Sequence, residues 1–228
     1  MGKMSEKPLK IYFAGDLFDA KDLAGNLLFA RSVEKFSDGR YQVFLPQNGE
    51  CEVRDRTTQS IRDKDFEELF ECDVIVANFD GTDPDSGTVA EFCFAKMADM
   101  PAVLLRTDFR SGGDETLPDN VPWNLMCVNY PRTRVLCLNS MECYHRSLGG
   151  AADAWAVLDS FYRTLALELI DALDKVTGEP SWLREDEIYP HFLRLMQSIG
   201  GSLPQRFPER RIKALAAAKI ESGLFRQV

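Results

Sequence analysis

The stretch that decides the fold runs from Asp73 to Met100 and reads DVIVANF, then DGTDPDSG, then TVAEFCFAKMADM. The first part is a short β-branched run of the kind that fills the middle of a parallel sheet covered on both faces. The second part is a turn, and the third predicts a helix over 88–100. Ligands of open α/β sheets bind beyond the carboxyl ends of the strands. The acids that follow this strand therefore indicate a candidate site; they are Asp80, Asp83, Asp85 and Glu91.

These acids also allow two structural interpretations. Thr88 and Glu91 have the spacing of a capping box, in which the glutamate turns back to the start of its own helix. Asp80 and Glu91 also stand at the first and twelfth positions of a possible calcium loop. Pro84 and Asp85 occupy the positions where that loop needs a ligand and a glycine, so calcium is excluded and no metal site is predicted. The capping interpretation stays open on spacing alone.

Strands and helices alternate on both sides of this stretch. The further predicted strands occupy 9–15, 41–45, 101–106 and 134–138, and the helices between them occupy 21–36 and 57–71. This alternation predicts an α/β fold with a doubly wound, flavodoxin-like five-stranded parallel sheet. We expect the charged residues of the second helix to form a solvated face; they are Asp63, Lys64, Asp65, Glu67 and Glu68.

The turn after the first strand contains a single glycine, Gly15. Dinucleotide fingerprints and phosphate loops need several glycines at fixed spacing, because the backbone must approach the phosphates closely. NAD and ATP are therefore not predicted, and no other cofactor is.

Beyond Gly149 and Gly150 the pattern changes to helices without strands. The first of them, over 151–176, carries apolar residues at helical spacing that must be buried somewhere: Trp155, Leu158, Phe161, Leu165 and Leu169. We expect an α/β domain over 8–140 and a helical extension over 150–228 packed on it. The segment 107–120 is long and rich in turn residues, which is typical of a lid, a binding loop or disorder.

Composition excludes several classes of partner. The chain has 27 basic and 36 acidic residues, a net charge of −9, so no nucleic-acid partner is expected. No apolar run reaches the ~20 residues that span a bilayer, and the first residues lack the apolar core of a signal peptide. The six cysteines form no Cys-x-x-Cys pair. We therefore expect reduced thiols, a cytoplasmic location and no membrane partner.

Polar residues gather at the predicted carboxyl ends of three strands and in the long loop. The chain resembles the nucleoside 2-deoxyribosyltransferases in four pieces that occur in order: IYFAG (11–15), Asp73 opening a hydrophobic strand, DSGTVAE (85–91) and PWNLM (122–126). The resemblance covers Lys10 to about Asn139. It implies an enzyme that moves 2-deoxyribose from a 2′-deoxynucleoside to a free nucleobase with retention of configuration.

The resemblance also implies a role for each matching residue. Glu91 matches the nucleophile that attacks C1′ and forms a covalent deoxyribosyl-enzyme, and Tyr12 matches a tyrosine that orients this glutamate. Asp73 and Asp85 match acids that contact and protonate the leaving base. Asn124 matches an asparagine that a neighbouring subunit contributes to the 5′-hydroxyl, which implies a homodimer or a higher oligomer. The remaining expected substrate-binding residues are Ala14, Gly15, Gln47, Asn48, Asp80, Gly87 and Met126.

The chemistry of such a transfer suits these residue types. An oxocarbenium-like transition state needs a carboxylate on one face of the sugar and a proton donor on the leaving group. Carboxylates at close range raise one pKa, which supplies that donor near neutral pH.

Two other functions remain open on the sequence. Relatives that hydrolyse nucleoside 5′-monophosphates carry the glutamate but usually have serine where Asp85 stands, and a carboxylate there repels phosphate. Hydrolysis could also accompany transfer as a side activity. The third possibility is a sensing domain that binds nucleosides without turnover.

Overall fold

The computed structural model describes residues 7–49, 56–110, 118 and 120–226. Its centre is a sheet whose strands are β1 (Leu9–Ala14), β2 (Tyr41–Phe44), β3 (Val74–Asn78), β4 (Ala102–Arg106) and β5 (Thr133–Cys137). Within the described residues the sheet has five strands in the order β2-β1-β3-β4-β5, and every pair is parallel. The predicted flavodoxin-like α/β fold is confirmed. The strand order reverses between β1 and β3, which is the position where such sheets bind ligands.

Successive side chains of β1 and β3 point to opposite faces, because the strand period is two. Ile11 and Val74 belong to one buried cluster, and Tyr12 and Ile75 belong to the other. All four are fully buried. The uninterrupted apolar run of β3 therefore has a simple cause, since each face of the strand lies under helices.

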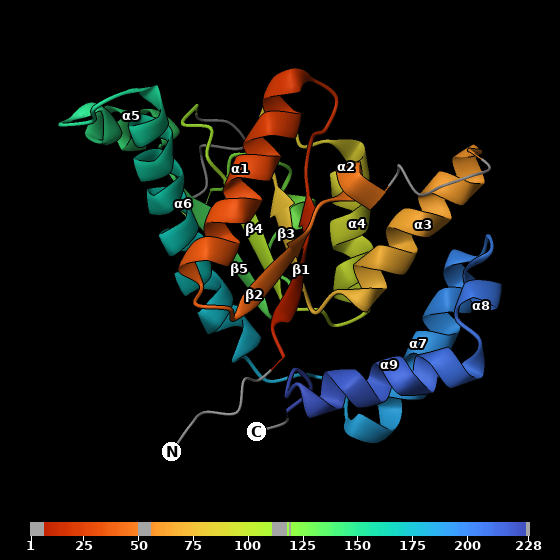
Figure 1. Ribbon diagram of the computed structural model, residues 1–228. Helices are drawn as coiled ribbons and strands as arrows, with labels where there is room; N and C mark the ends of the chain where they lie inside the picture. Colours follow the sequence, from red (N-terminus) through yellow and green to blue (C-terminus); the bar gives the residue numbers. More distant parts are fainter. Residues whose placement is uncertain (1–6, 50–55, 111–117, 119, 227–228) are drawn as a thin grey trace, which may run out of the picture.

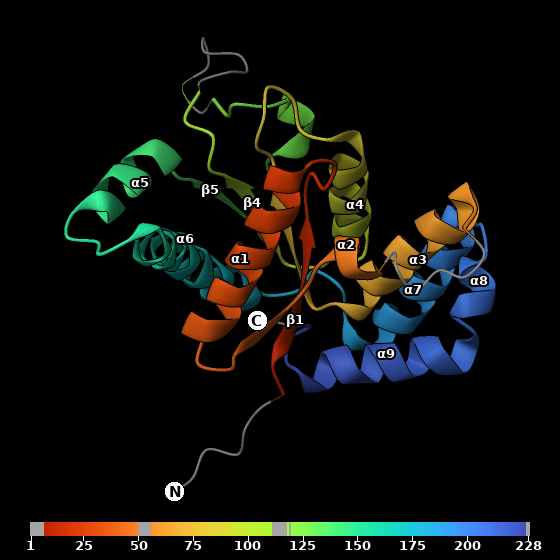
Figure 2. The same ribbon diagram turned by 45° about the horizontal axis from the view of Figure 1, so that its top comes forward.

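Helices α1 (Ala20–Phe36) and α6 (Ala154–Thr177) cover one face, and α3 (Thr58–Glu71) and α4 (Ser86–Met97) cover the other (Figures 1 and 2). The short helix α2 (Pro46–Gly49) follows β2 and contacts β1 and α3. A 3-10 turn, η2 (Leu125–Cys127), lies before β5, and α5 (Ser140–Leu148) follows it and packs against α6.

Helix α6 packs against β4, β5 and α1. Its buried residues begin at Leu165, whereas Trp155, which we expected on the buried face, is 73% exposed. A helix of 24 residues is about 36 Å long, and a five-residue strand spans only about 17 Å. The first turns of α6 therefore extend past the sheet.

The other helices of the predicted extension lie on the opposite side of the sheet, beside α3 (Figures 1 and 2). They are α7 (Glu185–Ile199), α8 (Leu203–Arg206) and α9 (Glu209–Glu221). The Phe70 ring of α3 meets the Phe192 ring at 6.4 Å and the Phe207 ring at 6.5 Å, and all three side chains are buried. The extension thus contributes to both cores, while the division into a domain over 8–140 and an extension over 150–228 stays a prediction.

Two long-range contacts fix the end of the chain to the sheet. The buried Lys219 Nζ donates to the carbonyl oxygen of Cys72, just before β3. The Arg132 side chain donates to the Asp99 carboxylate at 2.8 Å and to the Leu224 carbonyl oxygen at 2.5 Å. Most of the predicted loop over 107–120 lies outside the described residues. No helix among the described residues is long and apolar enough to span a membrane.

Candidate active site

A hydrogen bond between Tyr12 and Glu91 lies at the switch point of the sheet. The Tyr12 hydroxyl, on β1, donates to Glu91 Oε1, on α4, at 2.6 Å. Tyr12 is fully buried, and its ring stacks on Phe44 of β2 with the centroids 5.7 Å apart. Because a buried ring has one orientation, the carboxylate that it holds is also fixed in position.

The environment of this pair changes its protonation. Burial raises the pKa of Glu91 from 4.5 to about 7; the Tyr12 hydrogen bond opposes this rise, and the charges of Asp65 and Asp85 add to it. Burial also raises the pKa of Tyr12 well above 10, and the charge of Glu91 raises it further. Tyr12 therefore stays a donor, and Glu91 gains its charge near neutral pH.

Asp85 caps the helix that carries Glu91. Helix α4 begins at Ser86, and Asp85 Oδ2 accepts from the backbone NH of Thr88 at 2.8 Å and from its hydroxyl at 3.2 Å. The capping interpretation of Thr88 and Glu91 is therefore wrong, since Glu91 lies in the second turn and bonds to Tyr12 instead. A Cβ on Gly87 would lie 2.9 Å from Asp85 Oδ2, so a larger residue here would push against the capping carboxylate.

The structure does not bring Asp73 to this site. Asp73 immediately precedes β3, at the amino end of the strand, where it accepts from the backbone NH of Lys10 at 2.8 Å. Its other oxygen lies 3.7 Å from Lys219 Nζ. A strand of five residues separates it from the carboxyl end by about 16 Å. The expected role of Asp73 as an acid at the base has no support in this geometry.

Asp65 is the acid that the sequence analysis missed. We expected it on a solvated face of α3, but its charge raises the pKa of both Glu91 and Tyr12, so it lies within electrostatic range of the pair. Helix α3 packs against β1 and α4, which carry those two residues. The signal was present in the spacing, because Asp65 is four residues from Ile61 and from Leu69 and so shares their stripe.

Other acids line the same edge of the sheet. Asp80 Oδ1 accepts from the backbone NH groups of Thr107 at 2.6 Å and Asp108 at 2.7 Å, which fixes the start of the loop after β4. Asp16, directly after Gly15, was also missed; burial raises its pKa, and the charges of Asp85, Asp22 and Asp80 raise it further. The edge is therefore strongly negative.

The remaining predicted residues near β1 and β2 lie on adjacent elements. Ala14 is fully buried at the end of β1, and a Cβ on Gly15 would lie 3.1 Å from the Asn78 Cβ, so the chain passes close to β3 there. Gln47 and Asn48 lie on α2. The Gln47 side chain accepts from Asn26 Nδ2 at 3.3 Å and donates to the Leu23 carbonyl at 3.1 Å, which fixes it beside α1.

The sequence that forms this site matches a known protein family. The family model for nucleoside 2-deoxyribosyltransferase matches residues 11–126, which is 116 of the 228 residues. The chain belongs to the nucleoside 2-deoxyribosyltransferase family. The matched region contains Tyr12, Asp65, Asp85 and Glu91, and membership implies nucleoside and nucleobase substrates. A search of curated proteins gives no match.

Three solved structures are similar to this chain. A conserved protein from Enterococcus faecalis V583 has 22% identity and a TM-score of 0.46, covering 74% of this chain and 98% of its own. A 2-desoxiribosyltransferase from Leishmania mexicana has 23% identity and a TM-score of 0.43, covering 54% and 87%. A 2-deoxyribosyltransferase from Bacillus psychrosaccharolyticus has 21% identity and a TM-score of 0.41, covering 53% and 81%.

The nucleoside 2-deoxyribosyltransferase match ends at Met126, two residues after Asn124. In the single chain Asn124 is exposed, and its Oδ1 accepts from the backbone NH of Met126 at 2.9 Å as the cap of η2. Leu125 is 60% exposed and Met126 is 69% exposed. Nothing in the described chain buries this apolar pair.

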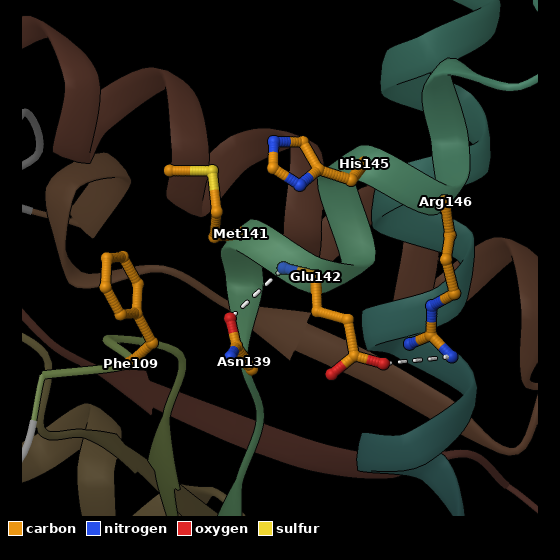
Figure 3. Close-up of a pocket in the computed structure, with 6 residues that line it drawn as sticks. All are labelled: Phe109, Asn139, Met141, Glu142, His145 and Arg146. Carbon is orange, nitrogen blue, oxygen red and sulfur yellow. Dashed lines mark hydrogen bonds and ion pairs between the residues drawn. The ribbon is translucent and has the colours of Figure 1, made fainter.

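A hollow beside α5 does not belong to the site. Figure 3 shows its lining, which comes from the loop after β4, from the residue that caps α5 and from α5 itself: Phe109, Asn139, Met141, Glu142, His145 and Arg146. Tyr12 and Glu91 are not among these residues. Among the described residues, no group of three or more His, Cys, Asp or Glu side chains could hold a metal ion.

Proposed function

We propose that this nucleoside 2-deoxyribosyltransferase family member moves 2-deoxyribose between nucleobases by a retaining double displacement. The observation that carries the proposal is the Tyr12–Glu91 hydrogen bond, which holds a half-buried carboxylate at the ligand-binding edge of the sheet. Acidic side chains surround this carboxylate, as a glycosyl transfer with an acid and a nucleophile requires.

Glu91 is the proposed nucleophile. Its free oxygen attacks C1′ of the deoxynucleoside, the N-glycosidic bond breaks, and the bond's electron pair leaves with the base. Tyr12 holds the other oxygen, Oε1, and so orients the attack. A second base then attacks C1′ from the opposite face and releases Glu91. Two inversions give net retention, and water in place of the second base gives the side hydrolysis.

The leaving base needs a proton, and Asp85 and Asp65 are the proposed acids. Both act electrostatically on Glu91, one from the turn before α4 and one from α3. Asp65 takes the place that was expected for Asp73, because the charge of Asp65 acts on both Tyr12 and Glu91, whereas Asp73 precedes β3 at the amino end of the strand. A deoxysugar has no 2′-hydroxyl, so we propose that Gln47, Asn48, Asp80 and the chain at Ala14, Gly15 and Gly87 shape the rest of the site.

The proposed substrates are 2′-deoxynucleosides and free nucleobases without a 5′-phosphate. The charges of Asp16, Asp80 and Asp85 lie at the same edge of the sheet and repel a phosphate monoester. Hydrolysis of nucleoside monophosphates therefore receives no support from the site.

Incubation with 2′-deoxyinosine and adenine tests the proposal. We expect chromatography to show 2′-deoxyadenosine and hypoxanthine appearing together, with any excess of hypoxanthine matched by free deoxyribose from the side hydrolysis. Hypoxanthine with free deoxyribose but no new nucleoside would identify a hydrolase, and unchanged substrates would support a sensing domain. Parallel incubations with deoxynucleoside monophosphates test the exclusion of phosphate.

Asn124 is proposed to complete the site of a neighbouring subunit in a homodimer or a higher oligomer, where it contacts the 5′-hydroxyl. Its exposure beside Leu125 and Met126 supports this assignment. Loss of one hydrogen bond costs about 1–2 kcal/mol, so we expect Asn124→Ala to lower activity about five- to thirtyfold.

Mixing variants tests the shared site. In a mixed dimer of Glu91→Ala and Asn124→Ala subunits, one site carries both changes and the other carries neither. After random exchange about a quarter of all sites are intact, so we expect activity above the mean of the two parents. Mass spectrometry verifies the exchange. No gain after verified exchange would show that Asn124 acts in its own chain or has no role.

A further inference from the structure

Helix α3 lies between the candidate active site and the C-terminal helices (Figures 1 and 2). Asp63 and Asp65 are two residues apart on this helix, and side chains at that spacing point to different faces. On one side α3 packs against β1 and α4, which carry Tyr12 and Glu91, and the charge of Asp65 raises the pKa of both. Asp63 points to the turn between α7 and α8, residues Gly200 to Ser202. Because α3 is one helix, a shift of its position at the Ser202 contact also shifts Asp65 relative to Tyr12 and Glu91.

The Asp63 carboxylate makes several short hydrogen bonds at this contact. Asp63 is fully buried, and its Oδ2 accepts from the backbone NH of Ser202 at 2.6 Å and from the Ser202 hydroxyl at 2.8 Å. Arg62 donates to Asp63 Oδ1 at 2.7 Å and to the Ile199 carbonyl at 2.9 Å. Gly201 has φ +65°, and a Cβ there would lie 2.5 Å from Asp63 Oδ1. The backbone of the turn therefore has a conformation that favours glycine, and it lies in direct contact with the Asp63 carboxylate.

Further ion pairs on the same side hold α3 to the C-terminal helices. Glu67 accepts from Arg206 at 2.5 Å and from Arg211 at 2.6 Å, and Arg211 also pairs with Glu71. Arg206 Nε donates to the Ser202 hydroxyl at 2.9 Å, which joins these pairs to the Asp63 contact. All the partners from the C-terminal helices lie outside the region that the family model matches.

We propose that Asp63, through its contact with the turn at Gly200 to Ser202, is a positioning residue that holds Asp65 of α3 at its place beside Tyr12 and Glu91. The proposal rests on the proposed function for the catalytic role of Glu91. It assigns the C-terminal helices a part in the reaction, because they fix the helix that supplies an acid to the site.

The charged groups around Glu91 and Asp63 determine how the pKa of each side chain should change. Glu91 meets Tyr12 of β1, Asp65 of α3 and Asp85 before α4. Burial would raise the pKa of Asp63, but the Ser202 hydrogen bonds and the charge of Arg62 outweigh burial and lower it. Asp63 therefore stays charged while Glu91 titrates. Moving Asp65 away removes a negative charge from the surroundings of Glu91, so the pKa of Glu91 should fall.

The test measures the pKa of Glu91 directly, by carbon-13 NMR of glutamate carboxyl groups, with Glu91→Gln to assign the signal. Asp65→Asn removes the charge itself, and the resulting change in the pKa of Glu91 is the reference for the other variants. We expect Asp63→Ala to lower the pKa by at least half of that shift, and Asp63→Asn, which keeps an acceptor for Ser202, to lie closer to the wild type. Ser202→Ala, which keeps the Asp63 carboxylate and the backbone donor, is the milder variant if Asp63→Ala fails to fold.

Two controls separate positioning from a general loss of stability. Ser181→Ala removes a hydrogen bond of 2.6 Å to Asp99 at another attachment of the C-terminal segment, so it should lower the melting temperature without moving the pKa of Glu91. The double variant Asp63→Ala with Asp65→Asn should shift the pKa no further than Asp65→Asn alone. An unchanged pKa in both Asp63→Ala and Ser202→Ala, or additive shifts in the double variant, would overturn the proposal.

The same variants should move the acidic limb of the pH profile of kcat/KM to lower pH. The NMR titration needs no turnover. A wild-type protein without transfer activity would therefore contradict the proposed function and leave the positioning of Asp65 open to the same measurement.

Discussion

Replacing Glu91 with glutamine should abolish transfer and should also stabilise the folded protein at pH 8. An amide is not a nucleophile, so we expect activity to fall roughly a thousandfold or more. The amide oxygen still accepts the Tyr12 hydrogen bond, so substrate binding should persist. Activity of Glu91→Ala within tenfold of the wild type would contradict the assignment of the nucleophile.

The stability effect follows from the raised pKa of Glu91. The folded protein keeps a proton up to about pH 7, whereas the unfolded chain releases it near 4.5. Stability from this group is therefore fully present below pH 4.5 and is lost as the pH rises through 7. This rise in the pKa of Glu91 corresponds to a loss of at most about 3.4 kcal/mol of unfolding free energy, which glutamine avoids because it never ionises.

Denaturant unfolding of the wild type and Glu91→Gln at pH 4 and pH 8 measures this effect. We expect the variant to be more stable at pH 8 and equal at pH 4. Glu142→Gln is the matched control, since it makes the same chemical change at a side chain that is 64% exposed on α5. Equal stability at both pH values would show that Glu91 titrates as an ordinary glutamate.

A chain that ends at Gly149 should not form a soluble, monodisperse protein. It lacks α6, which covers β4 and β5, and it lacks α7 to α9, which cover Phe70. The apolar surface that remains would be large enough to drive association. Size-exclusion chromatography and circular dichroism measure the outcome. A truncated protein that is soluble, monodisperse and equally active would contradict the expected packing of the extension.

Single substitutions in the C-terminal helices test their packing on the rest of the protein with smaller changes. Phe192 is 1% exposed in the core shared by α3 and α7, so Phe192→Ala should cost about 3–5 kcal/mol of unfolding free energy. Trp155 is 73% exposed on α6, so Trp155→Ala should change it by less than about 0.5 kcal/mol. Equal losses in both variants would contradict the burial pattern described for the two helices.

The fold could be predicted because the strong sequence signals agree with the tertiary structure. The apolar run of β3 is buried on both faces, and the helices between strands match the parallel connections. The site could be predicted in part: the structure brings Tyr12 and Glu91 together, while their roles in catalysis stay predictions. The prediction for Asp73 does not agree with the geometry. Asp73 precedes β3 and so lies at the amino end of the strand, whereas the site lies at its carboxyl end.

Asp63 and Asp65 could not be assigned from charge alone. A run of charged residues on a helix is usually solvated, but here the C-terminal helices cover Asp63, and β1 and α4 pack on the same helix near Asp65. The partner of Asp63 is Ser202, 139 residues later in the chain. Local periodicity cannot specify a partner at that separation. Only the packing of α7 and α8 against α3 determines which charges are buried.

The buried lysine of α9 has a consequence for biosynthesis. Lys219 reaches the Cys72 carbonyl from 147 residues away, and Leu224 reaches Arg132 from 92 residues away. The ribosome makes these residues long after the strands that they contact. A nascent chain that does not yet include α9 still exposes the backbone oxygen before β3 and the phenylalanine side chains of α3, so the native core cannot close before α9 has been made. Chaperones that bind apolar segments should therefore hold this chain until α9 has left the exit tunnel.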